Sequence, residues 1–136
     1  MWIQPSHLEI AELLRNAKTI AVLGASSNPS RPSHGIMDYL LSVGYQVIPV
    51  NPKEPEVLGQ KSYPDLASIP FIPDIVDVFR QSDAVPGIVE EAIAKGAKAI
   101  WLQEGVIHLE AAERAQAAGL LLVMDRCIYK DHVRLG

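Results

Sequence analysis

Five short apolar segments, most of them separated by helical patterns, constrain the fold of this chain more than any other feature. They cover residues 19–23, 45–50, 75–79, 99–102 and 120–124. Short apolar strands that alternate with helices are typical of a parallel sheet covered on both faces. Because crossovers between parallel strands are right-handed, few topologies remain. The sequence therefore predicts an α/β fold with a doubly wound, five-stranded parallel sheet in a three-layer αβα sandwich.

Local signals add detail to this fold. Ser6-x-x-Glu9 is a capping box that predicts the start of a first helix. A second helix is expected over residues 34–43, directly after Ser33. Pro49 indicates that the second strand lies near an edge of the sheet, or that the proline lies late in the strand. Residues 51–70 are expected to form a loop with one short helical turn.

Length and composition exclude several classes of protein. The 136 residues predict a single domain over 1–136, and 49% hydrophobic with 21% charged residues is ordinary for a globular protein. A net charge of −4 with scattered basic residues argues against nucleic-acid binding. No apolar run approaches the roughly 20 residues of a membrane span, and no secretory signal is visible. The one cysteine fits a reducing compartment, so we expect a cytoplasmic protein.

The loop after the first strand is the first candidate site. In a doubly wound sheet, ligands bind where the carboxyl ends of the strands meet. The loop lacks the G-x-G-x-x-G fingerprint because no glycine lies between Gly24 and Gly35. Its hydroxyls, its one guanidinium and the following helix N-terminus still suit a phosphate. The candidate ligand-binding residues are Gly24, Ala25, Ser26, Ser27, Arg31 and Ser33. A plain loop with Ser33 as a helix cap is the alternative.

The next two strand exits extend this candidate site. Asn51, Pro52 and Lys53 follow the second strand, at the place where NAD enzymes usually carry an acidic residue. A lysine there favours an extra phosphate near the ribose, as in NADP or coenzyme A, unless it is only a solvated turn residue. Val78, Phe79 and Arg80 end the third strand. Arg80 adds a positive charge, whereas Phe79 either packs on an adenine ring or belongs to the core.

The fifth exit, Asp125-Arg126-Cys127, is less informative. Asp125 and Arg126 are expected to form a local ion pair. Cys127 has no obvious histidine partner, because the sequence cannot place His108 or His132 beside it, so an idle thiol is favoured over a reactive one. The four histidines show no metal-ligand spacing, and we predict no metal site.

Five segments carry a resemblance to a known family. They are AVLGASSNPSRPSHG, GYQVIPVNPKEPEVLGQKSYPDL, DIVDVFR, GAKAIWLQEGV and AGLLLVMDRC. In this order they resemble the small stand-alone CoA-binding proteins, which are similar to the N-terminal domain of the succinyl-CoA synthetase alpha subunit. The resemblance implies a Rossmann-like domain that binds coenzyme A. It implies phosphate contacts from the 25–33 loop, contacts from Lys53 and from residues 78–80, and a thiol end near Glu104, Gly105 and Cys127.

The departures from that family pattern restrict what the resemblance implies. Ser27 and Pro29 replace glycines of the synthetase loop, and the synthetase's second domain with its phosphorylated histidine has no counterpart. A non-catalytic coenzyme A binding protein is therefore the leading hypothesis. The alternatives are an NADP-dependent oxidoreductase or epimerase, an acyl-CoA hydrolase or transferase that uses Cys127, and a protein-interaction module.

Overall fold

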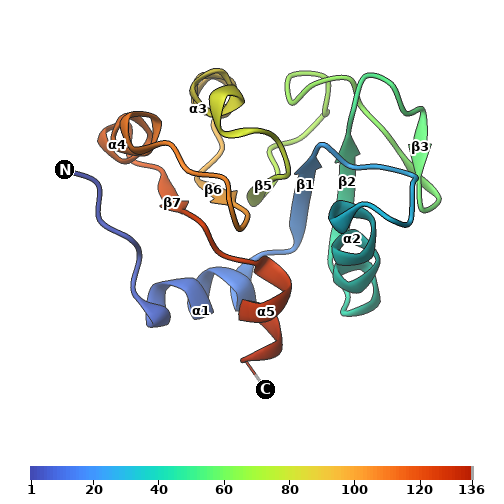
Figure 1. The fold of residues 1–136 in the computed structure, drawn as a ribbon, viewed down its shortest axis with the longest axis horizontal. Coiled ribbons are helices and arrows are strands. Elements are labelled where there is room, and N and C mark those ends of the chain that lie inside the picture. The colour runs from blue at the N-terminus through green and yellow to red at the C-terminus, as the bar shows by residue number, and fades with distance from the viewer. Residues whose placement is uncertain (136) are drawn as a thin grey trace.

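The computed structural model, which describes residues 1–135, contains a five-stranded parallel sheet (Figure 1). Its order is β2-β1-β5-β6-β7, and every neighbouring pair is parallel. The strands are β1 (Thr19–Leu23), β2 (Gln46–Val50), β5 (Ile75–Val78), β6 (Ala99–Leu102) and β7 (Leu121–Val123). The predicted α/β fold with a doubly wound, five-stranded sheet is confirmed.

Helices cover both faces of this sheet and make the predicted three layers (Figure 1). One layer contains α3 (Val85–Lys95) and α4 (Leu109–Ala117); the other contains α1 (His7–Asn16), α2 (Pro32–Ser42) and α5 (Ile128–Val133). The side chains between the layers form two hydrophobic clusters, one on each face of the sheet. The central strands β1 and β5 are buried along nearly their whole length, which explains why they are apolar apart from Thr19 and Asp77.

The chain winds outward from β1 in both directions. β2 lies on one side of β1, and the chain then returns to place β5 on the other side. The carboxyl ends of β1 and β5 therefore flank the point where the winding reverses, which is the usual ligand position in such sheets. β2 is an edge strand and Pro49 is its fourth residue, so the expectation from this proline is confirmed.

Two elements were not predicted. Residues 51–70 contain a small antiparallel hairpin, β3 (Glu56–Val57) and β4 (Gln60–Lys61), in place of a simple loop. Strands of two residues are too short to show a periodic pattern. The final helix α5 was also missed, because its six residues span fewer than two turns.

The helix starts are partly as predicted. Ser6 Oγ accepts from the Glu9 amide at 3.1 Å, and the Glu9 carboxylate accepts from the Ser6 amide at 3.0 Å, so the capping box is confirmed. The alternative in which Ser33 caps α2 is wrong, since the helix begins at Pro32 and Ser33 lies inside its first turn. Proline has no amide hydrogen to satisfy and a helical φ, and it is therefore favoured at this first position. No helix within residues 1–135 is long and apolar enough to cross a membrane.

Candidate functional site

The loop after β1 passes very close to the end of β5. Gly24 has φ +86°, and a Cβ atom at this position would collide with the carbonyl oxygen of Phe79. The Gly24 amide donates to the Val50 carbonyl at 3.0 Å, and the Asn51 side-chain amide donates to the Ala25 carbonyl at 2.8 Å. These contacts bring the exits of β1, β2 and β5 together, although they are far apart in the sequence.

A first cavity, which we call the cationic pocket, lies between these three exits. Its volume is about 260 Å³, and it is lined by Gly24, Val50, Asn51, Pro52, Lys53 and Arg80. Five of these six residues were predicted as ligand-binding residues from the sequence. The Lys53 and Arg80 side chains come from different strand exits, and the tertiary fold places both at one cavity. The cationic pocket is therefore suited to an anionic group.

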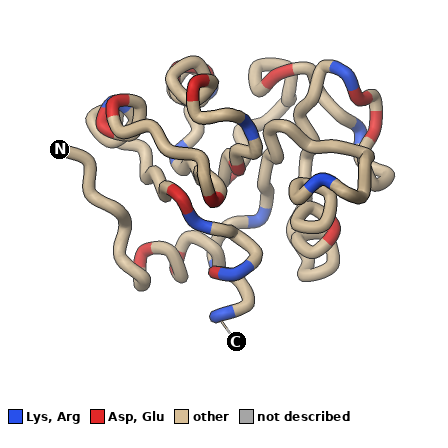
Figure 2. The backbone as a smooth tube through the Cα atoms, in the orientation of Figure 1, with Lys and Arg blue, Asp and Glu red and all other residues tan. Residues whose placement is uncertain are grey.

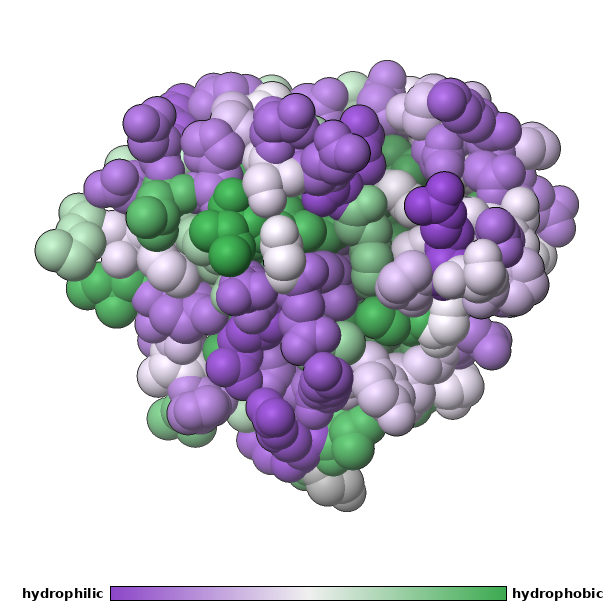
Figure 3. All heavy atoms as spheres, in the orientation of Figure 1, coloured by the Kyte–Doolittle hydropathy of each residue, from purple (hydrophilic) through white to green (hydrophobic). Residues whose placement is uncertain are grey.

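A second cavity, the apolar pocket, adjoins the first and also contacts Gly24. Its volume is about 380 Å³, and its lining comes from the ends of β1, β5 and β6 and the starts of α2 and α5. The lining residues are Gly24, Arg31, Pro32, Ser33, Ile36, Phe79, Gln103, Glu104, Val106 and Cys127. Figure 3 shows hydrophobic side chains between polar ones near the middle of one face of the molecule. Together the two pockets form a continuous candidate site with a charged and an apolar part.

Four of the predicted site residues do not line either pocket. The Ala25 and Val78 side chains are fully buried in the two hydrophobic clusters. The Ser26 hydroxyl accepts a hydrogen bond from the Asn28 amide at 3.0 Å, so it stabilises the loop. Phe79 packs against the core, as one of its two interpretations predicted, and it also lines the apolar pocket; its contact with an adenine ring stays a prediction.

The basic side chains of the candidate site form no ion pairs with acidic side chains of the described residues. Within residues 1–135, Arg31, Lys53 and Arg80 take part in none of the ion pairs. Arg114 and Arg126, by contrast, each pair with a carboxylate, on Glu90 and Asp131 respectively. Basic and acidic residues are interspersed along the backbone in Figure 2. These three exposed basic side chains at one edge of the sheet are therefore available to an anionic ligand.

An acidic side chain lies at the same loop. The Ser27 amide donates a hydrogen bond to the carboxylate of Glu54, and this contact lowers the pKa of Glu54. Glu54 follows Lys53 directly, and the carboxylate places a negative charge on an amide that was predicted to face a phosphate. No local sequence pattern indicates this contact, because Ser27 and Glu54 are 27 positions apart.

The environment of Cys127 differs from the prediction in one respect. The Arg126 guanidinium forms a bidentate ion pair with the Asp131 carboxylate, with nitrogen–oxygen distances of 2.8 and 2.5 Å. The predicted ion pair between Arg126 and Asp125 is therefore wrong. Asp125 instead accepts from the Gly105 amide at 2.7 Å. Asp131 is one turn further along the chain and faces Arg126 once α5 forms.

The two histidines considered as partners of Cys127 make other contacts. His108 Nδ1 accepts from the Ala111 amide and caps α4, and His132 Nδ1 contacts the Tyr39 hydroxyl at 2.6 Å. Burial lowers the pKa of His132. Over the described part of the chain, no group of three or more histidine, cysteine or acidic side chains could hold a metal ion.

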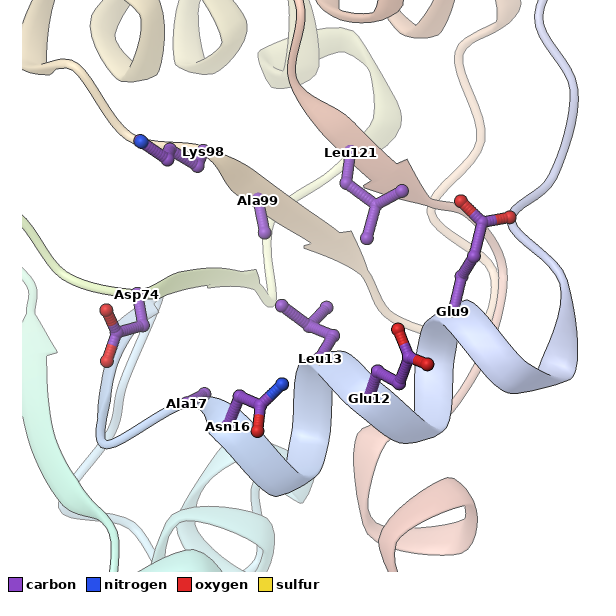
Figure 4. A pocket seen from close by; sticks show the side chains of 9 residues that line it. All are labelled: Glu9, Glu12, Leu13, Asn16, Ala17, Asp74, Lys98, Ala99 and Leu121. Atoms are coloured by element: carbon purple, nitrogen blue, oxygen red, sulfur yellow. The ribbon is translucent and has the colours of Figure 1, made fainter.

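A separate groove lies at the opposite edge of the sheet (Figure 4). Its volume is about 410 Å³, and it is bounded by α1 and by the amino ends of β5, β6 and β7. Figure 4 shows the Glu9 and Glu12 side chains on α1 and Lys98 directed away from them. Asp74 is already bound to the backbone amides of Lys18 and Thr19, at 2.7 and 3.0 Å. None of the predicted ligand-binding residues lines this groove, although it is slightly larger than the apolar pocket.

Two buried polar residues lie near the carboxyl edge of the sheet, and the burial of neither side chain was predicted from the sequence. Gln103 is only 5% exposed, and its Oε1 accepts from the Ile128 amide at 3.2 Å. Asp77 is fully buried on β5, and neither carboxylate oxygen has a hydrogen-bond partner within residues 1–135. Burial raises the pKa of Asp77 well above the usual value of a carboxyl group. An acidic residue inside the apolar run IVDVF was a visible signal that the sequence analysis did not use.

Comparisons with known proteins found a matching family model and several relatives. The model of a family described as CoA binding domain matches residues 18–133. An uncharacterized protein of Bacillus subtilis (strain 168), YneT, is 41% identical over 128 residues, which are 94% of this chain and 95% of that protein. The solved structure of a hypothetical protein from Pyrococcus horikoshii OT3 has a TM-score of 0.93 at 44% identity, covering 96% of this chain and 92% of that one.

A further relative is much longer than this chain. The ADP-forming acetate–CoA ligase I of Archaeoglobus fulgidus is 31% identical over 127 residues, which are 86% of this chain. The match covers 18% of the ligase. The chain therefore spans about a fifth of that ligase.

Proposed function

This chain belongs to the CoA-binding domain family, and on that premise we propose that it binds coenzyme A, or an acyl-CoA, without catalysing a reaction itself. The ligand lies across the carboxyl edge of the sheet and occupies both the cationic and the apolar pocket. Charged side chains contact one end of the bound ligand, and apolar side chains contact its other end.

One observation carries the proposal most directly: three unpaired basic side chains converge on one edge of the sheet. Lys53 and Arg80 line the cationic pocket, and Arg31 lines the apolar pocket beside it. Coenzyme A carries a 3′-phosphate and a diphosphate on its nucleotide part. Positive charges that lack a protein partner gain strong, charge-assisted hydrogen bonds when phosphate oxygens arrive. Lys53 and Arg80 are the proposed partners of the 3′-phosphate, and Arg31 is the proposed partner of the diphosphate.

The apolar pocket supports a ligand that has a long uncharged arm. The pantetheine arm of coenzyme A is mostly apolar and contains two amide groups and a terminal thiol. Pro32, Ile36, Phe79 and Val106 supply apolar surface for such an arm. NADP also carries an extra phosphate near its ribose, but its nicotinamide end is a flat, polar ring. The apolar surface that these four side chains supply and the family membership favour coenzyme A.

The absence of catalysis is proposed from the contacts of the side chains that line the pockets. His108 and His132, the bases considered for Cys127, are held by other contacts. A hydrolase or transferase needs a base within hydrogen-bond reach of its nucleophile. The acetate–CoA ligase relative has most of its length outside the matched region, so its activity is not transferred to this chain.

Calorimetric titration tests the proposal with three ligands: CoA, dephospho-CoA and NADPH. We expect CoA to bind at micromolar concentrations and dephospho-CoA to bind more weakly, because it lacks the phosphate assigned to Lys53. Absence of heat with CoA would overturn the proposal. Tighter binding of NADPH than of CoA would replace it with the oxidoreductase hypothesis. Free thiol released from acetyl-CoA or succinyl-CoA would contradict the non-catalytic part.

A further inference from the structure

We infer that Cys127 is a site of reversible covalent modification, at which the thiol end of coenzyme A becomes attached to the protein through a mixed disulfide. This inference rests on the proposed function, because the binding of the nucleotide part brings the reacting sulfur atoms together. It goes beyond that function by assigning a chemical role to a residue that non-covalent binding does not use.

Cys127 lies between the start of α5 and the apolar pocket. The residue lies directly before α5 and is 7% exposed, and it lines the apolar pocket. It also lines a smaller cavity of about 160 Å³ with Arg126, Lys130 and Arg134. Cys127 therefore faces the candidate site and is largely shielded from other molecules in solution. The Cys127 thiol is accessible to a molecule that enters the pocket and poorly accessible to other molecules in solution.

Two buried polar side chains in the same pocket point independently to a ligand. Ser33 is 3% exposed and Gln103 is 5% exposed, and both line the apolar pocket. The Gln103 oxygen accepts from the Ile128 amide, which directs the side-chain NH₂ group elsewhere. Within residues 1–135, neither this NH₂ group nor the Ser33 hydroxyl has a hydrogen-bond partner. Both donors are accessible from the pocket, since the two Asp77 oxygens are the only fully buried side-chain atoms without a partner within residues 1–135, and both are therefore available to a ligand with hydrogen-bond acceptors.

The order of the residues along the site matches the order of groups along coenzyme A. Lys53 and Arg80 lie in the cationic pocket, and Gly24 joins that pocket to the apolar one. Gln103 and Cys127 come from the β6 and β7 side, beyond β5. A ligand whose phosphates occupy the cationic pocket therefore extends its arm toward Gln103 and ends near Cys127. The Ser33 and Gln103 donors are suited to the two amide carbonyls of the arm.

The covalent step is a thiol–disulfide exchange with the disulfide of coenzyme A as co-reactant. The Cys127 thiolate attacks one sulfur of the disulfide, a bond forms between Cys127 Sγ and that sulfur, and the original sulfur–sulfur bond breaks. The leaving CoA thiolate takes up the proton that Cys127 lost and departs as free CoA. One disulfide is consumed and one is formed, so no other oxidant is needed. An excess of any small thiol reverses the step.

The test uses the whole chain, its single cysteine and intact-mass spectrometry. We expect CoA disulfide to add the mass of one CoA less two hydrogen atoms, and dithiothreitol to remove it. Cys127→Ser is expected to gain no mass, which locates the adduct. A small neutral disulfide, hydroxyethyl disulfide, serves as the comparison at equal concentration. Binding of the nucleotide part raises the local concentration of the disulfide, so modification by CoA disulfide is expected to be about tenfold faster or more.

Two further measurements separate this inference from the proposed function. Lys53→Ala is expected to lower the ratio of the modification rate with CoA disulfide to the rate with hydroxyethyl disulfide. Calorimetry with CoA in the presence of dithiothreitol measures non-covalent binding by itself. If reduced CoA binds but CoA disulfide reacts no faster than the neutral disulfide, the inference is overturned and the proposed function stands. If reduced CoA does not bind at all, the proposed function fails first.

Discussion

The carboxylate of Glu54 accepts a hydrogen bond from the backbone amide of Ser27, at the loop that is proposed to contact the phosphates of coenzyme A. The hydrogen bond lowers the pKa of Glu54, so the group is ionised at neutral pH. An anionic side chain thus occupies one of the donors that an incoming phosphate requires. Ligand binding must therefore displace Glu54 or leave this donor unused.

Glu54→Gln is expected to raise the affinity for CoA by a factor of about two to ten, because it removes a negative charge from the phosphate loop. Titration at low and high salt checks this expectation, and the gain should shrink as salt screens the repulsion. Glu56→Gln is the matched control, since Glu56 is also exposed and acidic but has no hydrogen bond to the loop. Equal effects of the two substitutions would contradict a specific role for Glu54.

Lys53→Ala is expected to weaken CoA binding by about 1.5 kcal/mol, roughly tenfold, because hydrogen bonds to charged groups contribute about this much. The affinity for dephospho-CoA should change much less, since that ligand lacks the phosphate assigned to Lys53. Lys98→Ala is the control, because Lys98 lies in the groove at the opposite edge of the sheet. If Lys53→Ala weakens both ligands equally, the phosphate is not bound by Lys53.

Gly24→Ala is expected to reduce the free energy of unfolding by about 3 kcal/mol, which urea denaturation measures. The left-handed φ of +86° costs about 1–2 kcal/mol for a residue with a Cβ, and the collision with the Phe79 carbonyl forces the backbone to shift. Gly35→Ala is the control. Gly35 lies inside α2 with open space around it, so alanine should stabilise the helix by about 0.5–1 kcal/mol. If Gly24→Ala left the free energy of unfolding unchanged, the loop and β5 would be able to move apart without loss of stability.

Asp77→Asn is expected to make the free energy of unfolding less sensitive to rising pH. Burial raises the pKa of Asp77 in the folded state above the unfolded value, so the unfolded chain loses its proton first. Stability is then fully present below about pH 4 and falls as pH rises toward the folded-state pKa, by at most about 1.4 kcal/mol per pH unit. Asparagine has no proton to lose.

Urea denaturation of both proteins across a series of pH values measures this effect. The difference in unfolding free energy, variant minus wild type, should increase from pH 4 toward neutral pH. Asp74→Asn is a useful contrast because hydrogen bonds with the Lys18 and Thr19 amides lower the pKa of Asp74, so its contribution to stability is present above its unfolded pKa and is lost as pH falls. A constant difference for Asp77→Asn would mean that Asp77 keeps its ordinary pKa.

Much of the fold was predictable because its signals are local. The five strands, the capping box and the edge position of Pro49 each depend on residues within a few positions of one another. The wrong cap at Ser33 has a local cause as well: a serine before an apolar pattern resembles a cap, but Pro32 begins the helix one position earlier. The hairpin formed by β3 and β4 and the helix α5 were too short to give a pattern.

The candidate site was predictable only as a set of strand exits. Parallel topology requires these exits to lie at one edge, which explains why Gly24, Lys53 and Arg80 were selected together. The sequence could not show which side chains point into a cavity, and Ala25 and Val78 turn into the core. Whether each selected residue contacts a ligand stays a prediction for the titrations above.

The sequence by itself determined the alternation of strands and helices, and with it the edge of the sheet that is the candidate site, because hydrophobic periodicity is a property of neighbouring residues. The tertiary structure alone decided that Glu54 meets the Ser27 amide and that Arg126 pairs with Asp131. Such contacts depend on distances between side chains after the layers have packed. No local pattern in the sequence encodes those distances.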